Sequence, residues 1–193
     1  MNLNGASIRW LRYRLGLVGA DTQTTPAERG CLERHAAGRH AIVELGVMHG
    51  ATTALLRRVM AGDGSVTGID PHPPGRLRVS FERWVALREV SKCPRGTATL
   101  VRDTSHGAAA GWRTPIDFLF IDADHSWSAI ARDWADWTPH VIDGGLVALH
   151  DSRSVPGRPD ADSVRFMREV VAHDTRFRIV DEVDSLTVLR RLG

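Results

Sequence analysis

Short apolar runs alternate with amphipathic stretches along most of this 193-residue chain. The apolar runs each have the length of a buried strand, and they cover residues 41–45, 65–69, 97–101, 116–121 and 146–149. Helix-like stretches separate them, at about residues 51–60, 77–90, 106–112 and 126–137. Strands that alternate with helices predict βαβ units and a parallel sheet covered on both faces. The sequence therefore predicts a doubly wound α/β fold.

Both ends of the chain depart from that alternation. The motif Thr25-Pro26-Ala27-Glu28 has the pattern of a capping box, which predicts a helix that runs to about Gly38. The residues before it are basic and partly apolar but lack the continuous apolar run of a signal peptide, so we expect a surface helix or arm. Near the C-terminus, two β-rich runs at residues 177–183 and 186–189 predict a hairpin.

Three local features lie between these ends. The turn residues Asp143-Gly144-Gly145 are expected to end just before the fifth strand. In the helix at 126–137, Ile130, Trp134 and Trp137 share one face, and we expect Asp133 to lie elsewhere on the helix. Residues 151–160 have the least regular pattern and are expected to form a loop beside the ligand-binding edge of the sheet.

Composition excludes several classes of protein. With 42% hydrophobic residues the chain is not disordered, and its apolar stretches are far shorter than the ~20 residues of a membrane helix. The 25 basic residues are dispersed among 23 acidic ones, without the basic stripe that nucleic-acid binding favours. Cys31 and Cys93 are too few and too isolated for a disulfide framework or a zinc knuckle, which favours a reducing, cytoplasmic setting.

The first predicted strand runs into a glycine-containing turn. Dinucleotide-binding loops need G-x-G-x-x-G, whereas here Met48 stands where the second glycine would be and the spacing is Gly46-x-x-x-Gly50. Glu44 beside the turn would repel a pyrophosphate but suits a cationic ligand. S-adenosylmethionine is such a ligand, because it carries an ammonium and a sulfonium group and no phosphate. We expect contacts to it from Glu44, Gly46, Gly50 and Thr52, and a plain tight turn is the alternative.

Aspartates follow the second and third predicted strands. Asp70 is placed to accept hydrogen bonds from ribose hydroxyls, as acidic residues do both in NAD enzymes and in methyltransferases. It therefore supports an adenosine-type ligand without choosing between the two classes. Asp103 is expected either to meet the adenine amino group or to cap the next helix.

The clearest chemical signal comes from the ends of the fourth and fifth strands. Asp122 and His125 follow the fourth, and the pair His150-Asp151 follows the fifth. Neighbouring parallel strands would bring these side chains together, and converging carboxylates need a cation or protonation. A divalent metal held by Asp122, His150 and Asp151 is the natural partner, with magnesium favoured by oxygen ligands and manganese by an added histidine. His125 would then be free to act as a general base.

Four strings together resemble class I S-adenosylmethionine-dependent methyltransferases: ELGVMHGATT, GIDPH, FLFIDADHSWSAIARDW and PHVIDGGLVALHD. More narrowly, they resemble the group of macrocin-type sugar O-methyltransferases and cephalosporin-hydroxylase-like proteins. The resemblance implies a Rossmann-like seven-stranded sheet in the order 3-2-1-4-5-7-6, with strand 7 antiparallel. It implies cofactor contacts at Glu44, Gly46, Asp70 and Asp103. It also implies a metal at Asp122 and His150-Asp151 with His125 as base, although relatives place two acidic or amide residues where His150-Asp151 stands.

The resemblance places the methyltransferase domain at residues 41–193, after an N-terminal helical extension at 1–40 that either closes over the cofactor or mediates a homodimer. It implies divalent-metal-assisted O-methylation of a small hydroxylated acceptor, a sugar or a phenol of a natural product, with Asp122 and His125 as catalytic residues. No nucleic-acid or membrane partner is expected. The alternatives are an NAD(P)-dependent oxidoreductase on a Rossmann sheet and a non-catalytic module that binds an adenosine ligand.

Overall fold

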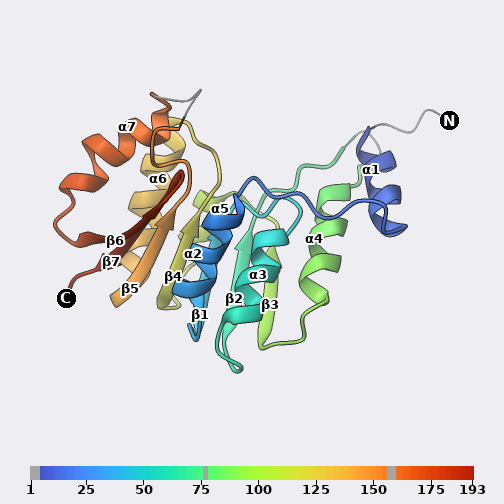
Figure 1. The fold of residues 1–193 in the computed structure, drawn as a ribbon, viewed down its shortest axis with the longest axis horizontal. Coiled ribbons are helices and arrows are strands. Elements are labelled where there is room, and N and C mark those ends of the chain that lie inside the picture. Colours follow the sequence, from blue (N-terminus) through green and yellow to red (C-terminus); the bar gives the residue numbers. More distant parts are fainter. Residues whose placement is uncertain (1–4, 76–77, 156–159) are drawn as a thin grey trace.

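A computed structural model describes residues 5–75, 78–155 and 160–193, and it contains one seven-stranded sheet (Figure 1). Its strands are β1 (Ala41–Leu45), β2 (Ser65–Ile69), β3 (Thr97–Val101), β4 (Ile116–Ile121), β5 (Val141–Leu149), β6 (Phe177–Val183) and β7 (Leu186–Arg191). They lie in the order β3-β2-β1-β4-β5-β7-β6. The first five pair in parallel, and β7 runs antiparallel between β5 and β6. This confirms the predicted fold and strand order.

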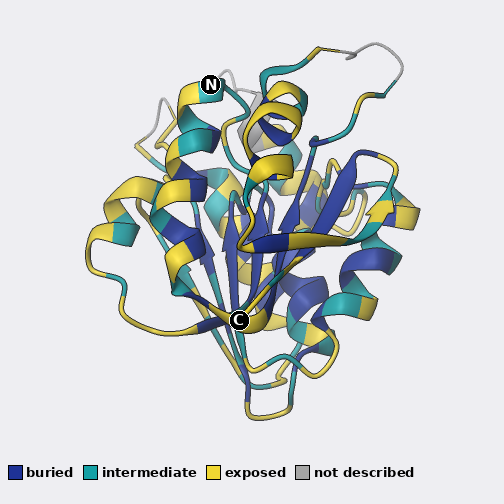
Figure 2. Ribbon diagram, turned by 90° about the vertical axis from the view of Figure 1, so that its left-hand side faces the viewer, coloured by how far each residue is buried: buried dark blue, intermediate teal, exposed yellow. Residues whose placement is uncertain are grey.

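Helices cover both faces of the sheet. They are α1 (Gly5–Arg14), α2 (Pro26–Ala36), α3 (Ala51–Val59), α4 (Phe81–Ser91), α5 (Ser105–Ala110), α6 (Trp127–Trp137) and α7 (Asp162–Glu169), with short 3-10 helices at Thr138–His140 and Val171–His173. The central strands β1 and β4 are mostly buried, and the helices turn exposed sides outward (Figure 2). Residues of β4 alternate between the faces, with Phe118 and Phe120 packed against the side of α2 and α3, and Leu119 and Ile121 against the side of α6 and α7.

Several local predictions are confirmed, and three are corrected. The Thr25 hydroxyl accepts the Glu28 N–H at 3.1 Å while the Glu28 carboxylate accepts the Thr25 N–H at 2.8 Å, which completes the capping box. The Asp143-Gly144-Gly145 turn does not precede β5 but lies within it, as an irregularity between two paired segments. Helix α7 was not predicted, although Phe166 and Met167 lie three and four residues after Ser163 on its buried side. Residues 156–159 of the predicted loop, and Leu77 at the start of the predicted fourth helix, lie outside the described residues.

Asp133 is the third correction. It is 2% exposed and belongs to the buried side of α6, together with Ile130, Trp134 and Trp137. Its spacing of three from Ile130 and four from Trp137 gives the physical reason, because residues three and four apart share a helix face.

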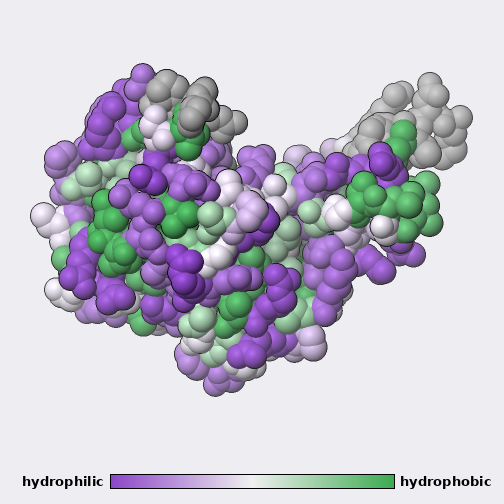
Figure 3. Space-filling view, viewed as in Figure 1, coloured by the Kyte–Doolittle hydropathy of each residue, from purple (hydrophilic) through white to green (hydrophobic). Residues whose placement is uncertain are grey.

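The N-terminal helix packs on the outer side of α4. Trp10 lies 5.3 Å from Trp84 and 6.0 Å from Phe81 between ring centres. Ile8 and Leu11 on this helix remain about half exposed, and Figure 3 shows hydrophobic residues gathered there. Within residues 5–75, 78–155 and 160–193, no helix combines the length and the apolar character that crossing a membrane requires.

Asp174 joins the C-terminal hairpin to α6. Its carboxylate accepts hydrogen bonds from the Arg176 guanidinium at 2.9 and 2.6 Å and from the Trp134 indole at 3.0 Å. The Arg176 hydrogen bonds outweigh burial and lower the pKa of Asp174 to about 2. A carboxyl group whose pKa falls on folding stabilises the fold above its unfolded pKa, and this stabilisation is lost as the pH falls through the folded value.

We therefore expect Asp174→Asn to lower the free energy of unfolding by about 1–2 kcal/mol at neutral pH, since Arg176 is half exposed and solvent screens the pair. Between about pH 4 and pH 2, the free energy of unfolding should also fall less in the variant than in the wild-type protein. Urea unfolding measured across that pH range checks both. Two superimposable pH profiles would contradict the expectation.

Candidate active site

A cavity of about 610 Å³ opens at the carboxyl ends of the parallel strands. Its walls come from the ends of β1, β2 and β4, from the segment after β3, from α6, and from residues 21–23 of the N-terminal segment. Open α/β sheets bind their ligands at this edge. The cavity lining has more acidic than basic residues. The acidic ones are Asp21, Glu44, Asp70, Asp122, Asp124 and Asp133, and the basic ones are His106, His125 and Arg132.

Glu44 lies at the floor of this cavity and is 1% exposed. Its carboxyl group accepts a hydrogen bond from the Thr53 hydroxyl. Burial, followed by the charges of Asp122 and Asp70, raises the pKa of Glu44 well above its usual value. A cation placed in the cavity would favour the ionised carboxylate, so the site gains from a positively charged ligand.

Gly46 brings two strand ends into close contact. Its φ is +87°, and a Cβ at this position would lie 2.1 Å from the carbonyl oxygen of Asp122. Only glycine tolerates both the conformation and the approach. The predicted role of Gly46 in the turn thus has a structural reason that does not depend on a ligand.

Asp70 ties the turn after β1 to the end of β2. One carboxylate oxygen accepts the N–H groups of Val47 and Met48 at 3.0 and 2.9 Å, and the other accepts the His72 N–H at 2.7 Å. A carboxylate offers about four acceptor positions, so about one remains for a ligand hydroxyl. The Gly46 N–H is also used, because it donates to the Ile69 carbonyl at 2.9 Å.

Asp122, His125, His150 and Asp151 converge, as the sequence predicts for the ends of β4 and β5. Asp122 Oδ1 lies 3.5 Å from His125 Nε2 and 2.9 Å from His150 Nδ1. Asp151 approaches the same two rings, at 3.4 Å from His125 Nε2 and 3.8 Å from His150 Nδ1. Asp122 and His125 line the cavity, whereas His150 is 3% exposed and lies behind them.

His150 lies between the buried carboxylate of Glu28 and the partly exposed carboxylate of Asp122. Its Nε2 lies 3.3 Å from Glu28 on α2, and its Nδ1 faces Asp122 without the geometry of a hydrogen bond. Burial alone would lower the pKa of His150, but Asp122, Asp151 and Glu28 raise it to about 9. Burial would likewise raise the pKa of Asp122, but His125 and His150 lower it.

Of three further predicted contact residues, only Thr52 lines the cavity. A Cβ on Gly50 would lie 2.8 Å from the Cα of Ala86, so this glycine lets α3 pack closely on α4. Thr52 lines the cavity, and its hydroxyl lies 3.4 Å from the Thr22 hydroxyl. Asp103 accepts the Thr104 N–H at 2.7 Å and is exposed outside the cavity; Thr104, not Asp103, caps α5.

Sequence reasoning missed two buried acids at this site. Asp133 lines the cavity, accepts a hydrogen bond from the Ser105 hydroxyl, and has a pKa that burial raises to about 6. Its position on the buried side of α6 was readable from the helical spacing. Glu28 accepts the Ser185 N–H at 2.9 Å and its hydroxyl at 2.6 Å, 157 residues away in the chain. No local pattern predicts that contact.

Comparison with known protein families matches residues 43–152 to a family model described as a methyltransferase domain. The chain belongs to this family. The match extends from β1 to just after β5, and so includes the turn after β1, Asp70, Asp122, His125 and the His150-Asp151 pair. The methyltransferase family that the sequence motifs resemble is thereby confirmed.

Solved structures show the same fold at low sequence identity. The methyltransferase superposes on a Corynebacterium glutamicum protein with a TM-score of 0.68 and 16% identity, covering 100% of this chain and 92% of that one. For the O-methyltransferase TomG from Streptomyces achromogenes, solved with SAM, the TM-score is 0.64 and the identity 16%, with the same coverage. For a Bacillus cereus O-methyltransferase solved with SAH, the TM-score is 0.61 and the identity 16%. The match covers 99% of this chain and 93% of that one.

Proposed function

We propose that this methyltransferase uses S-adenosylmethionine to methylate an oxygen of a small hydroxylated acceptor, a sugar or a phenol. One observation carries the choice of cofactor: the turn after β1 is surrounded by carboxylates, and its backbone donors are already used. A pyrophosphate needs free N–H groups at such a turn. Here the N–H groups of Gly46, Val47 and Met48 donate to the protein itself. A cationic ligand without phosphate suits this site, whereas the pyrophosphate of NAD(P) does not. This argues against an NAD(P)-dependent oxidoreductase.

Several residues in and beside the cavity have a proposed part in the reaction. S-adenosylmethionine, when bound, supplies an electrophilic methyl group on a sulfonium sulfur. Glu44 and Asp70 would hold its positively charged and ribose portions, and Gly46 lets it approach the backbone closely. As the acceptor oxygen bonds to the methyl carbon, the methyl–sulfur bond would break and S-adenosylhomocysteine would leave. The hydroxyl proton of the acceptor must also leave, and His125 would take it. Asp122 and Asp151, within 3.5 Å of the His125 ring, orient it and stabilise its charged form.

A divalent metal is part of this proposal, and the donor set fits one. The Nδ1 atom of His150 lies 2.9 Å from an Asp122 oxygen and 3.8 Å from an Asp151 oxygen, and this buried nitrogen makes no hydrogen bond. Asp122, His150 and Asp151 would hold the ion, and mixed oxygen and nitrogen donors favour manganese over magnesium. The metal would lower the pKa of the acceptor hydroxyl, which makes proton removal by His125 easier.

The cavity size and the N-terminal wall support a small acceptor. A volume of about 610 Å³ lies within the ~300–1,000 Å³ range of small-molecule sites, and one cofactor fills much of it. The segment at residues 21–23 closes one side, where the Asp21 N–H donates to His49 Nδ1 at 3.3 Å. We propose that this segment forms part of the lid over the cofactor.

Calorimetric titration with S-adenosylmethionine and with NAD tests the choice of cofactor, and only the first should bind. A transfer assay with hydroxylated sugars and phenols, run with manganese and with a chelator, then tests the chemistry. Activity lost in chelator and restored by manganese supports the metal, whereas full activity in chelator would remove it from the mechanism. Binding of S-adenosylmethionine without transfer to any acceptor in the panel would favour the non-catalytic alternative.

Asp70→Ala should weaken the binding of S-adenosylhomocysteine by about 1–3 kcal/mol, or roughly 5- to 150-fold. The variant loses the acceptor for the ribose and also releases the N–H groups of Val47 and Met48, which loosens the turn. Calorimetry measures the dissociation constant. Asp63→Ala removes an aspartate whose side chain is 83% exposed and serves as the matched control. Equal affinities in both variants would overturn the assignment of Asp70.

A further inference from the structure

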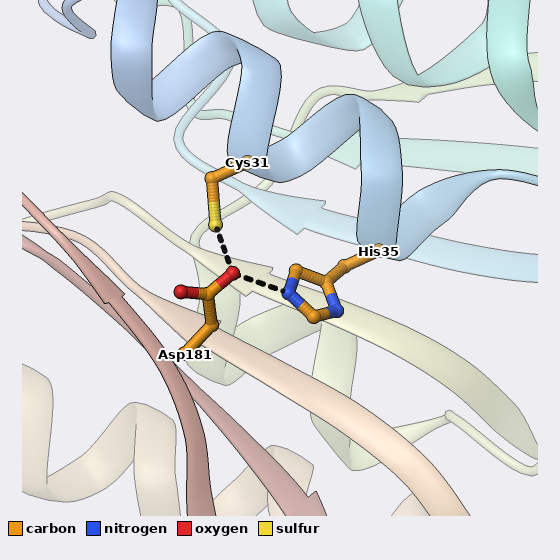
Figure 4. Close-up of side chains that lie close together, drawn as sticks. All are labelled: Cys31, His35 and Asp181. Atoms are coloured by element: carbon orange, nitrogen blue, oxygen red, sulfur yellow. Dashed lines mark hydrogen bonds and ion pairs between the residues drawn. The ribbon is translucent and has the colours of Figure 1, made fainter.

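A second cluster of metal-binding side chain types lies between α2 and β6, outside the cavity (Figure 4). Cys31 and His35 are four residues apart on α2, so their side chains share one side of that helix. Asp181 reaches them from β6. Its oxygen Oδ2 lies 3.5 Å from Cys31 Sγ and 2.9 Å from His35 Nε2. One thiol, one imidazole and one carboxylate thus meet at a single point.

The strand is irregular where it supplies the carboxylate. Ile179 pairs with Leu189 and Asp181 with Val188, so Val180 is an extra residue in β6. Such a bulge changes the direction in which the neighbouring side chains point. Here Asp181 contacts α2 through three residues, because the guanidinium of Arg34 also lies 3.1 Å from Oδ2.

We propose that Cys31, His35 and Asp181 form a three-ligand zinc site that fastens α2 to the C-terminal hairpin. Zinc binds thiolate, imidazole and carboxylate at about 2.0–2.3 Å in tetrahedral geometry, which places the donor atoms roughly 3–4 Å apart. The three donor atoms lie within 4.8 Å of one another, so small side-chain movements suffice. The side chains of His35 and Asp181 are 21% and 27% exposed, and water can therefore complete the coordination.

Two changes accompany metal binding. Burial and the nearby Asp181 raise the pKa of Cys31 to about 11, so the unliganded thiol is protonated and donates to the carboxylate. Zinc binding forms a sulfur–metal bond and releases that proton to solvent. The guanidinium of Arg34 must also leave Asp181, and its side chain is 61% exposed and free to turn outward.

The site would act on stability, independently of the proposed methyl transfer. Helix α2 carries Glu28, which accepts hydrogen bonds from Ser185 in the turn between β6 and β7 and pairs with His150. Zinc at the other end of the same helix would join α2 to the same hairpin a second time. The metal would therefore hold the back of the active site in place without touching a substrate.

Cobalt(II) titration of the chelator-treated, full-length protein tests the proposal, because cobalt bound to a thiolate gives a near-ultraviolet charge-transfer band. The cavity site contains no cysteine, so cobalt there gives no such band. We expect the band in the wild-type protein and in Cys93→Ser, and no band in Cys31→Ser. Zinc should displace the cobalt, and it should raise the Tm of the wild-type protein by more than it raises the Tm of Cys31→Ser.

Two further variants separate a zinc site from a metal-free tether. Asp181→Asn should weaken zinc binding by more than about tenfold in competition with a chromophoric chelator. Arg34→Ala removes the competing cation and should tighten zinc binding several-fold. If Asp181 instead holds α2 through Arg34 without a metal, this variant would only lower the stability of the protein. A folded wild-type protein that shows no thiolate band at saturating cobalt, or a band that persists in Cys31→Ser, would overturn the proposal.

Discussion

Asp122→Asn should lower kcat by about 10²–10⁴-fold, the range that general acid–base groups contribute. The substitution keeps the shape of the side chain but removes the charge that faces both His125 and His150. His125 would lose the carboxylate that orients it, and the proposed metal would lose a ligand. Affinity for S-adenosylmethionine should stay within a few-fold of wild type, because Glu44 and Asp70 remain. Asp122→Ala should have the same effect.

Steady-state kinetics together with calorimetry measure this split between turnover and binding. Asp143→Asn is the matched control, since this aspartate is 71% exposed and lies in the first part of β5, away from the cavity. It should behave as the wild-type protein does. Retention of wild-type turnover by Asp122→Asn would remove Asp122 from the mechanism, whether or not a metal is required.

Gly46→Ala should destabilise the protein by about 3 kcal/mol or more, which corresponds to a fall in Tm of roughly 6–12 °C for a chain of this size. The new Cβ would lie 2.1 Å from the carbonyl oxygen and 2.7 Å from the carbonyl carbon of Asp122. Both obstacles are backbone atoms, so no side chain can turn away. The ends of β1 and β4 must separate, and affinity for the cofactor should fall with stability.

Gly144→Ala separates steric clash from backbone strain. Gly144 has a φ of +75°, close to the +87° of Gly46, but a Cβ there has no neighbour within 4 Å. The control variant should therefore lose only about 1–2 kcal/mol, the cost of the left-handed conformation for an L-residue. Thermal unfolding of both variants measures the difference. Equal losses would show that the contact with Asp122 does not matter.

The sequence predicted the bounds of most strands, but it did not predict the turn within β5 or helix α7. The bounds of β1, β2, β3, β4 and β6 agree with the predicted runs. For β1 and β4 the reason is that a strand buried on both faces is built mainly of apolar residues, whereas β3 and β6 are partly exposed edge strands. The turn within β5 misled the prediction. Asp143-Gly144-Gly145 has the composition of a loop, but Val141 before it and Leu146 after it both pair with β4. Helix α7 was missed although its buried residues Ser163, Phe166 and Met167 have helical spacing, because only two of the three are apolar.

By itself the sequence determined which residues end the strands, and parallel neighbours must bring those ends together. It therefore predicted the convergence of Asp122, His125, His150 and Asp151, along with the sheet that carries them. Only the tertiary structure decided what lies behind and beside them. Glu28 reaches Ser185 and His150, and Asp181 reaches Cys31 and His35, across more than a hundred residues of chain. Periodicity and turn chemistry act over a few residues, whereas those contacts depend on how α2 packs against the C-terminal hairpin.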